Sequence, residues 1–102
     1  MIATLDLASL VLEQFQPLVN TDFLIRDHQV TAKLIEAQAL KGASGSLKRL
    51  PFRLLFVTDG LATPMFSQGV MQLDHKELGT LELFMVAIGQ RESGLAYEAI
   101  FN

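Results

Sequence analysis

Along most of the chain after Pro17, apolar and polar residues alternate with a period of two. Successive side chains of a β-strand point to opposite faces, so this period is typical of strands with one buried face. The clearest case is the segment 95–101, which puts four apolar side chains on a single face: Leu95, Tyr97, Ala99 and Phe101. The pattern therefore predicts a chain built mainly of β-strands.

Further segments with the pattern or composition of strands lie at 22–26, 30–40, 52–57, 70–75 and 81–88. Within 30–40 the apolar face changes between Leu34 and Ile35, which predicts a β-bulge or a bend there. A helix is the alternative for 30–40, because Ala, Lys, Leu, Glu and Gln are good helix formers. The segment 52–57 is apolar on both faces apart from Arg53, so we expect it in the centre of a sheet.

The segment 4–15 has a helical period instead. Thr4 is a suitable N-cap, and Asp6 lies in the first turn, where the helix dipole favours a negative charge. The apolar stripe of this helix would consist of Leu5, Ala8, Val11, Leu12 and Phe15. Leu7 and Leu10 fall outside the stripe, so we interpret them as candidate contacts with a second subunit.

These segments give one helix and about six strands. Short connections are expected at 41–46, 76–80 and 89–94. A chain of 102 residues corresponds to one domain, so we expect a single domain over 1–102, with the helix at 4–15 and a β-rich core at 20–102. Short connections favour antiparallel neighbours. The expected fold class is mainly β: a small antiparallel β-barrel or sandwich with one N-terminal amphipathic α-helix.

The residue types limit the chemistry that the chain can perform. It has no cysteine, which excludes disulfides, thiolate zinc sites and cysteine nucleophiles. It has no phosphate-loop, dinucleotide-binding, serine-hydrolase or zinc-protease motif. Adjacent residues of a strand point apart, so Asp74 and His75 are not expected to form a catalytic pair. We predict no enzyme activity, no cofactor and no metal site. His75 and Tyr97 are candidate polar groups of a small-ligand site in a barrel.

Basic residues are concentrated in one part of the sequence. Six of the eight lie between positions 26 and 53, and no acidic residue occurs between 37 and 58. Folding can mix these charges with distant acidic residues, or it can leave a basic patch for an anionic partner. In the second case, an Sm-like barrel would contact nucleic acid through Lys41, Lys48, Arg49 and Arg53. The net charge of −3 and the lack of tryptophan argue against nucleic-acid binding.

Most phenylalanines occupy positions at which the period demands an apolar residue, so we predict that they belong to the core. Phe66 is the exception, because it lies beside Met65 in a predicted connection; these two residues are candidate contacts on an exposed apolar tip. No apolar run approaches the roughly 20 residues that span a bilayer. The first residues also lack the basic region of a signal peptide. We expect a cytoplasmic protein without membrane contact.

Several short motifs stand out, mainly in the second half of the chain. They are Pro51-Phe52-x-Leu54-Leu55-Phe56, Gln68-Gly69, Leu73-Asp74-His75, Leu78-Gly79, Leu83-Phe84 and Tyr97-Glu98-Ala99-Ile100-Phe101-Asn102. Together they resemble an uncharacterised family of small bacterial β domains, a domain of unknown function. Met71 departs from the aromatic residue that the family pattern has at this position. The resemblance implies a compact β domain about as long as this chain, and it implies no activity.

The hypothesis that these observations favour is a non-enzymatic interaction or assembly module. Such a module would form a homo-oligomer, for example a homodimer, through its helix or through a sheet edge. The hypothesis depends on the apolar fraction of 50 % in a short chain, on the leucines outside the helix stripe and on the lack of paired catalytic groups. A different protein partner is compatible with the same features. Nucleic-acid binding and small-ligand binding in a barrel are the alternatives.

Overall fold

The computed structural model describes residues 10–40, 51–59, 68–91 and 94–101. This part of the chain contains one short helix, two 3₁₀ turns and six strands. Their bounds are α1 Leu12–Phe15, η2 Gln16–Leu18, β1 Asp22–Ile25, η3 Arg26–His28, β2 Val30–Ala39, β3 Phe52–Thr58, β4 Gln68–His75, β5 Gly79–Arg91 and β6 Gly94–Phe101.

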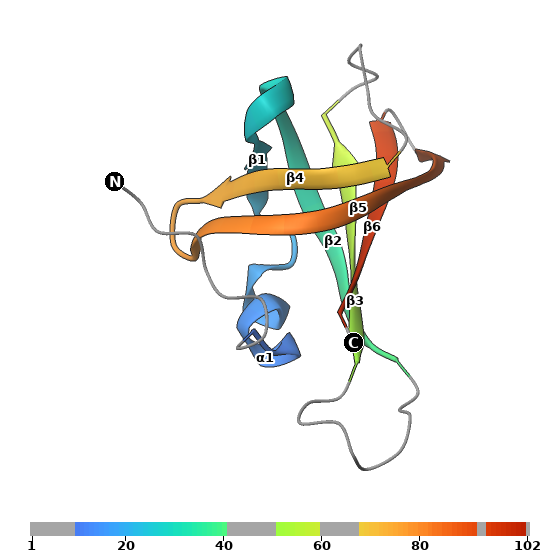
Figure 1. Ribbon diagram of the computed structural model, residues 1–102. Helices are drawn as coiled ribbons and strands as arrows, with labels where there is room; N and C mark the ends of the chain where they lie inside the picture. Colours follow the sequence, from blue (N-terminus) through green and yellow to red (C-terminus); the bar gives the residue numbers. More distant parts are fainter. Residues whose placement is uncertain (1–9, 41–50, 60–67, 92–93, 102) are drawn as a thin grey trace.

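The strands form a closed antiparallel barrel in the order β1-β2-β3-β6-β5-β4. Figure 1 shows β4 and β5 running across the direction of the other strands. The predicted mainly β fold is confirmed, and the alternative between barrel and sandwich is resolved in favour of the barrel. β1 and β4 close it with two residue pairs, Leu24 with Asp74 and Ile25 with Leu73. Each strand has a neighbour on both sides, although β1 pairs with only two residues of β4. Association through a sheet edge stays a prediction.

Two β-bulges bend the long strands around the barrel. In β2 the register shifts between Leu34 and Glu36, which confirms the β-bulge or bend predicted near Leu34 and Ile35. The helix alternative for this segment is wrong. In β5 the register shifts between Ala87 and Gly89. Gly89 has φ +136°, a backbone conformation that residues with a Cβ rarely adopt. Bulges increase local twist and bending, which a small closed barrel requires.

The end of β5 differs from the sequence prediction, which has a loop over 89–94. The strand continues to Arg91, with Gln90 paired to Leu95 and Arg91 paired to Gly94. Gln90 and Arg91 are both exposed. A strand end that buries neither face produces no alternation of apolar and polar residues, so the period of two could not indicate it.

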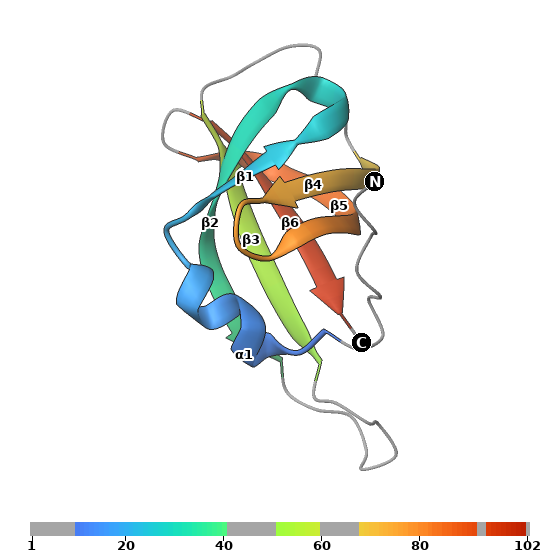
Figure 2. The same cartoon turned by 90° about the vertical axis from the view of Figure 1, so that its left-hand side faces the viewer.

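Aromatic side chains fill much of the barrel interior. Phe23 and Phe56 meet edge to face with ring centroids 5.2 Å apart, and Phe52 stacks on Phe101 with centroids 4.4 Å apart. Phe15 of α1 lies 5.8 Å from both of these stacked rings. The predicted core placement of these five phenylalanines is confirmed. Through Phe15, α1 covers one end of the barrel beside the ends of β2 and β3 (Figure 2).

Over the described residues, the helix is shorter than the predicted 4–15. The part from Leu12 to Phe15 is confirmed, but Val11 has an extended backbone with φ −130° and ψ 159°. In a continuous helix, Leu10 and Phe15 would point about 140° apart, whereas both are buried in the barrel core. The extended Val11 allows both side chains to enter the core. No helix in the described part is long and apolar enough to cross a bilayer.

Gly94 begins β6 at a point where the backbone of β3 comes very close. A Cβ at this position would overlap the carbonyl oxygen of Thr58 and would lie 3.0 Å from Val57 Cγ1. The next residue, Leu95, donates its N–H to Thr58 Oγ1 at 2.9 Å. This hydrogen bond fixes the spacing between the two strands, so the backbone has little freedom to yield.

We therefore predict that Gly94→Ala lowers the free energy of unfolding by about 2–3 kcal/mol, the upper part of the range for overpacking a well-packed site. Urea denaturation followed by circular dichroism measures this loss. The matched control is Ala39→Gly, which changes one Cβ at an exposed strand end and should cost at most about 1 kcal/mol. Equal losses in the two variants would contradict the close approach at Gly94.

Candidate functional site

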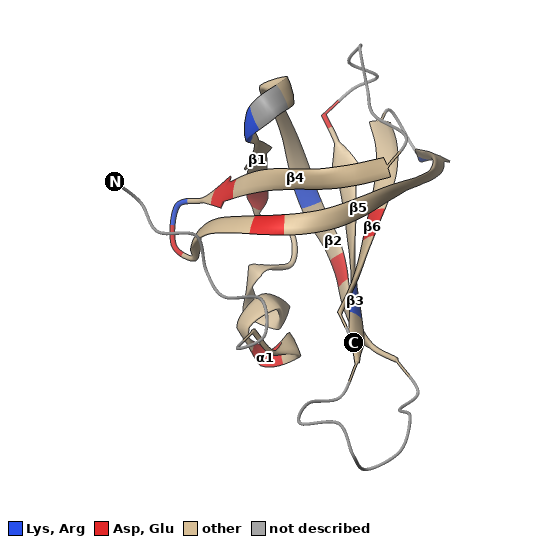
Figure 3. Ribbon diagram, in the orientation of Figure 1, with Lys and Arg blue, Asp and Glu red and all other residues tan. Residues whose placement is uncertain are grey.

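Of the basic residues predicted to contact nucleic acid, the structure describes only Arg53. Lys41, Lys48 and Arg49 lie outside the described residues. Arg53 of β3 forms an ion pair with Glu98, with Nε and Oε2 3.0 Å apart but without the alignment of a hydrogen bond. The charge of Arg53 is therefore locally neutralised. The described Lys and Arg positions are spread over several elements (Figure 3).

Of the four residues predicted to contact a second subunit, the structure describes only Leu10. Leu10 is only 2 % exposed and belongs to the core cluster, so the structure removes the exposure on which its predicted role depended. The physical reason is the extended Val11, which turns Leu10 into the barrel. Leu7, Met65 and Phe66 lie outside the described residues.

The two candidate polar groups of a ligand site are both buried in the barrel. His75 is 4 % exposed and borders a surface hollow of about 430 Å³, which Arg26, Asp74 and Thr80 also line. Tyr97 is fully buried and is not among the residues of this hollow. Burial raises the pKa of the Tyr97 hydroxyl above its ordinary value. Since aromatic rings fill the interior, these placements do not support a ligand site within the barrel.

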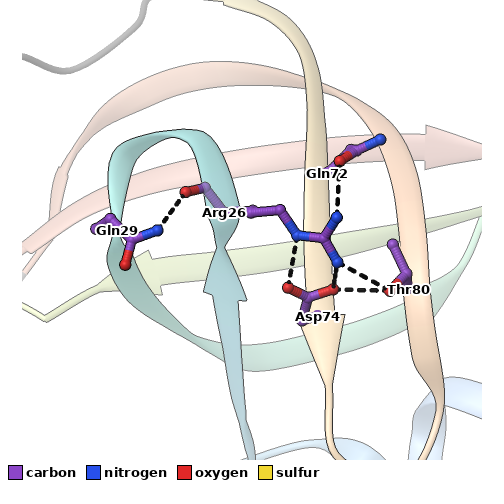
Figure 4. Close-up of polar contacts among 5 residues, drawn as sticks. All are labelled: Arg26, Gln29, Gln72, Asp74 and Thr80. Atoms are coloured by element: carbon purple, nitrogen blue, oxygen red, sulfur yellow. Dashed lines mark hydrogen bonds and ion pairs between the residues drawn. The ribbon is translucent and has the colours of Figure 1, made fainter. Parts of the chain in front are cut away.

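A cluster of polar side chains joins β1, β4 and β5 on the outside of the barrel (Figure 4). Arg26, directly after β1, donates from Nε to Asp74 Oδ2 at 2.9 Å and from Nη2 to Asp74 Oδ1 at 2.6 Å. Its Nη1 donates to Gln72 Oε1 at 3.2 Å. Thr80 of β5 donates its hydroxyl to Asp74 Oδ1 at 2.7 Å. We call Arg26, Gln72, Asp74 and Thr80 the polar cluster.

The polar cluster holds Asp74 in its ionised form. Hydrogen bonds from Arg26 and then Thr80 lower the pKa of the Asp74 carboxyl, and burial opposes this effect only in part. A carboxylate fixed in one charge state by a two-pronged guanidinium is suited to joining strands rather than to transferring protons. Its position fits that role, because Asp74 belongs to one of the two residue pairs that close the barrel and Arg26 directly follows Ile25 of the other.

Sequence analysis did not identify the polar cluster. The alternation over 70–75 correctly places Gln72 and Asp74 on the face opposite to His75. The partner Arg26 is 48 residues away from Asp74, and no local pattern indicates which strands meet at the closure. Among the described residues, no group of three His, Asp or Glu side chains could hold a metal ion.

A second feature of the outer surface is a row of exposed apolar side chains. Val70 of β4 and Phe84 of β5 face each other in the ladder and are 57 % and 53 % exposed. Ile100 of β6 is 51 % exposed. The β5–β6 ladder ends at the pair Val86–Glu98, and Ile100 lies two residues beyond this end, paired with Arg53 of β3. We call Val70, Phe84 and Ile100 the outer apolar row.

The outer apolar row corrects one prediction, because the sequence analysis placed Phe84 in the core. Leu83 and Met85, the neighbours of Phe84 in β5, point to the opposite face of the strand and are buried, whereas Phe84 is exposed. The signal that was available is Glu82, which shares a face with Phe84 and is exposed. Because the rest of the segment 81–88 is apolar on both faces, this single glutamate did not identify the exposed face.

Comparison with known protein families gave one finding. The family model described as Domain of unknown function (DUF6916) matches residues 10–101. Neither the comparison with curated proteins nor the comparison with solved structures gave a match.

The role of the polar cluster can be tested with a double-mutant cycle of Arg26→Met and Asp74→Asn. We expect a coupling energy of about 1 kcal/mol, the upper end for partly exposed ion pairs, because the contact is two-pronged. The lowered pKa of Asp74 means that this stabilisation is present above about pH 4 and is lost as the pH falls further. Urea unfolding at pH 7 and at pH 3 measures both effects. Additive losses at pH 7 would show that the pair does not join the strands.

Proposed function

We propose that the chain, which belongs to the family Domain of unknown function (DUF6916), acts as a non-enzymatic interaction module that associates with a second copy of itself. The contact surface is the outer apolar row. The observation that carries the proposal is that Val70, Phe84 and Ile100, on three neighbouring strands, each expose about half of their surface.

The arrangement of the row, rather than its mere exposure, supports a contact. Single exposed apolar side chains are normal on soluble proteins, whereas contiguous ones mark interaction sites. Val70 and Phe84 are paired in the β4–β5 ladder, where strands lie about 4.8 Å apart, so their side chains are contiguous. Ile100 adds apolar surface on β6, the next strand of the sheet. Ile88, further along β5, is also about half exposed and adds to the apolar surface of that strand.

The charges beside the row favour a second copy as the partner. Arg53 faces Ile100 in the β3–β6 ladder, and Glu98 lies against Arg53, so this border is neutral. An apolar strip with a neutral border is self-complementary, because a two-fold axis brings the same patch of two copies together. A contact between two copies therefore does not bring charges of the same sign together at this border.

The size of the row is consistent with the centre of a small interface. A standard interface buries about 800 Å² on each partner, with an apolar centre and a polar rim. Three half-exposed apolar side chains can supply the centre. Gln68 and Glu82, which are exposed on β4 and β5, can supply part of the rim.

The absence of enzyme activity in the proposal is supported by the hydrogen bonds that Asp74 and His75, the candidate acid–base groups, form within the fold. Asp74 is held ionised by Arg26 and Thr80. Both ring nitrogens of His75 contact other groups of the chain: Thr21 at Nε2, and the turn after β4 at Nδ1. Groups that are committed to hydrogen bonds within the fold are poorly placed to exchange protons with a substrate.

Sedimentation velocity of the full chain over a range of concentrations tests the proposal. We expect a dimer at about 300 µM and a dissociation constant at least tenfold larger for Phe84→Ser, because a central aromatic residue is a typical hot spot. The double variant Val70→Ser/Phe84→Ser should weaken the dimer further. The matched control is Val11→Ser, an exposed apolar residue outside the row, which should leave association unchanged.

Two outcomes would contradict the proposal. The first is a strictly monomeric wild-type chain at about 300 µM. The second is an equal loss of association in Val11→Ser and Phe84→Ser, which would show that the outer apolar row is not the contact surface. Circular dichroism of each variant must show the folded barrel, so that a loss of association is not a loss of structure.

A further inference from the structure

We infer that His75 is a pH-dependent cap of the turn between β4 and β5. The turn comprises residues 76–78 and joins His75 to Gly79, which face each other as the last pair of the ladder. His75 Nδ1 accepts the backbone N–H of Glu77 at 3.0 Å and that of Leu78 at 3.2 Å. The imidazole therefore satisfies two backbone donors that the turn leaves outside the ladder.

The hydrogen bonds around His75 define where its proton lies. Thr21 donates its hydroxyl to the carbonyl oxygen of Leu18 at 2.6 Å. The same hydroxyl oxygen lies 2.9 Å from His75 Nε2 and, having donated its own proton, accepts from that nitrogen. Nε2 therefore carries the proton, and Nδ1 offers a lone pair to the turn. The neutral ring with the proton on Nε2 is the form that satisfies all four contacts.

Protonation of His75 disrupts this arrangement at one atom. A proton on Nδ1 would point at the N–H groups of Glu77 and Leu78, so both hydrogen bonds to the turn would be replaced by contacts between donors. The bond from Nε2 to Thr21 would persist. The charged ring would also be 96 % buried, since His75 is 4 % exposed, and burial of an unpaired charge is costly. Acid therefore loosens the turn at residues 76–78.

The groups that face His75 do not offer a counter-charge at hydrogen-bond distance. Phe23 of β1 lies against the ring with centroids 4.5 Å apart, and the segment before β1 contributes the hydroxyl of Thr21. In the turn, Glu77 favours the charged ring and Lys76 disfavours it. Asp74 points to the outer face, where Arg26 binds it. Burial is the largest effect, and it lowers the pKa of His75.

The direction of this shift gives the sign of the pH dependence. A histidine in the unfolded chain has a pKa of about 6.5. Because the pKa of His75 in the folded chain is lower, the unfolded chain binds more protons between the two pKa values, and stability falls as the pH falls. The contribution of His75 is complete above about pH 6.5 and is lost during acidification below it.

Nuclear magnetic resonance of His28→Gln tests the inference, because this variant leaves His75 as the chain's sole histidine. The ring signals should titrate with a pKa below 6.5, and the amide signals of Glu77 and Leu78 should shift with the same midpoint. The equilibrium constant for unfolding should rise by up to about tenfold for each unit by which the pKa lies below 6.5.

A second variant tests whether the loss of stability in acid comes from His75 or from other titratable groups of the chain. In His75→Asn the side-chain oxygen can still accept the N–H groups of the turn but cannot take up a proton, so the step in stability between pH 7 and pH 5 should disappear. If this variant does not fold, the titration of His28→Gln still decides. A ring pKa at or above 6.5, or amide signals of Glu77 and Leu78 that do not follow the ring, would overturn the inference.

Discussion

The closure of the sheet between β1 and β4 is the contact on which the rest of the barrel depends. It consists of two residue pairs, whereas β4 and β5 share eight. Without it, Phe23, Ile25 and Leu73, which are fully buried, would border an open edge. The bidentate contact between Arg26 and Asp74 spans this same seam. A charge-assisted contact of fixed geometry thus supplements a ladder too short to be robust by itself.

Sequence reasoning succeeded where the controlling interaction is local. The period of two follows from the geometry of a single strand, so it located the strands and the shift of face at Leu34 without knowledge of their neighbours. It failed where a segment buries neither face, as at Gln90 and Arg91, and where tertiary packing overrides a local preference. Leu10 is the example of the second kind, since its burial in the core requires an extended Val11 inside a predicted helix.

The candidate surfaces were less accessible to sequence reasoning than the fold. Alternation correctly sends Asp74 and His75 to opposite faces, but it cannot say that Arg26 lies on the far side of the seam, because register across a closure is set by the whole sheet. The exposure of Phe84 was missed for a related reason. When a strand has apolar residues on both faces, its own sequence does not indicate which face is buried. The packing of neighbouring elements decides this.

The position of β6 has a consequence for how the chain acquires its structure during synthesis. The last strand of the chain lies between β3 and β5 in the sheet, and its Phe101 stacks on Phe52 beneath the helix residue Phe15. β6 is also the last of the described strands to be synthesised, so β1 to β5 cannot complete the sheet before it is available. Until β6 pairs with them, β3 and β5 each keep one unpaired edge. Closure of this barrel therefore requires pairing between strands far apart in the sequence, such as Phe52 of β3 with Phe101 of β6, and contacts of this kind are intrinsically slow to form.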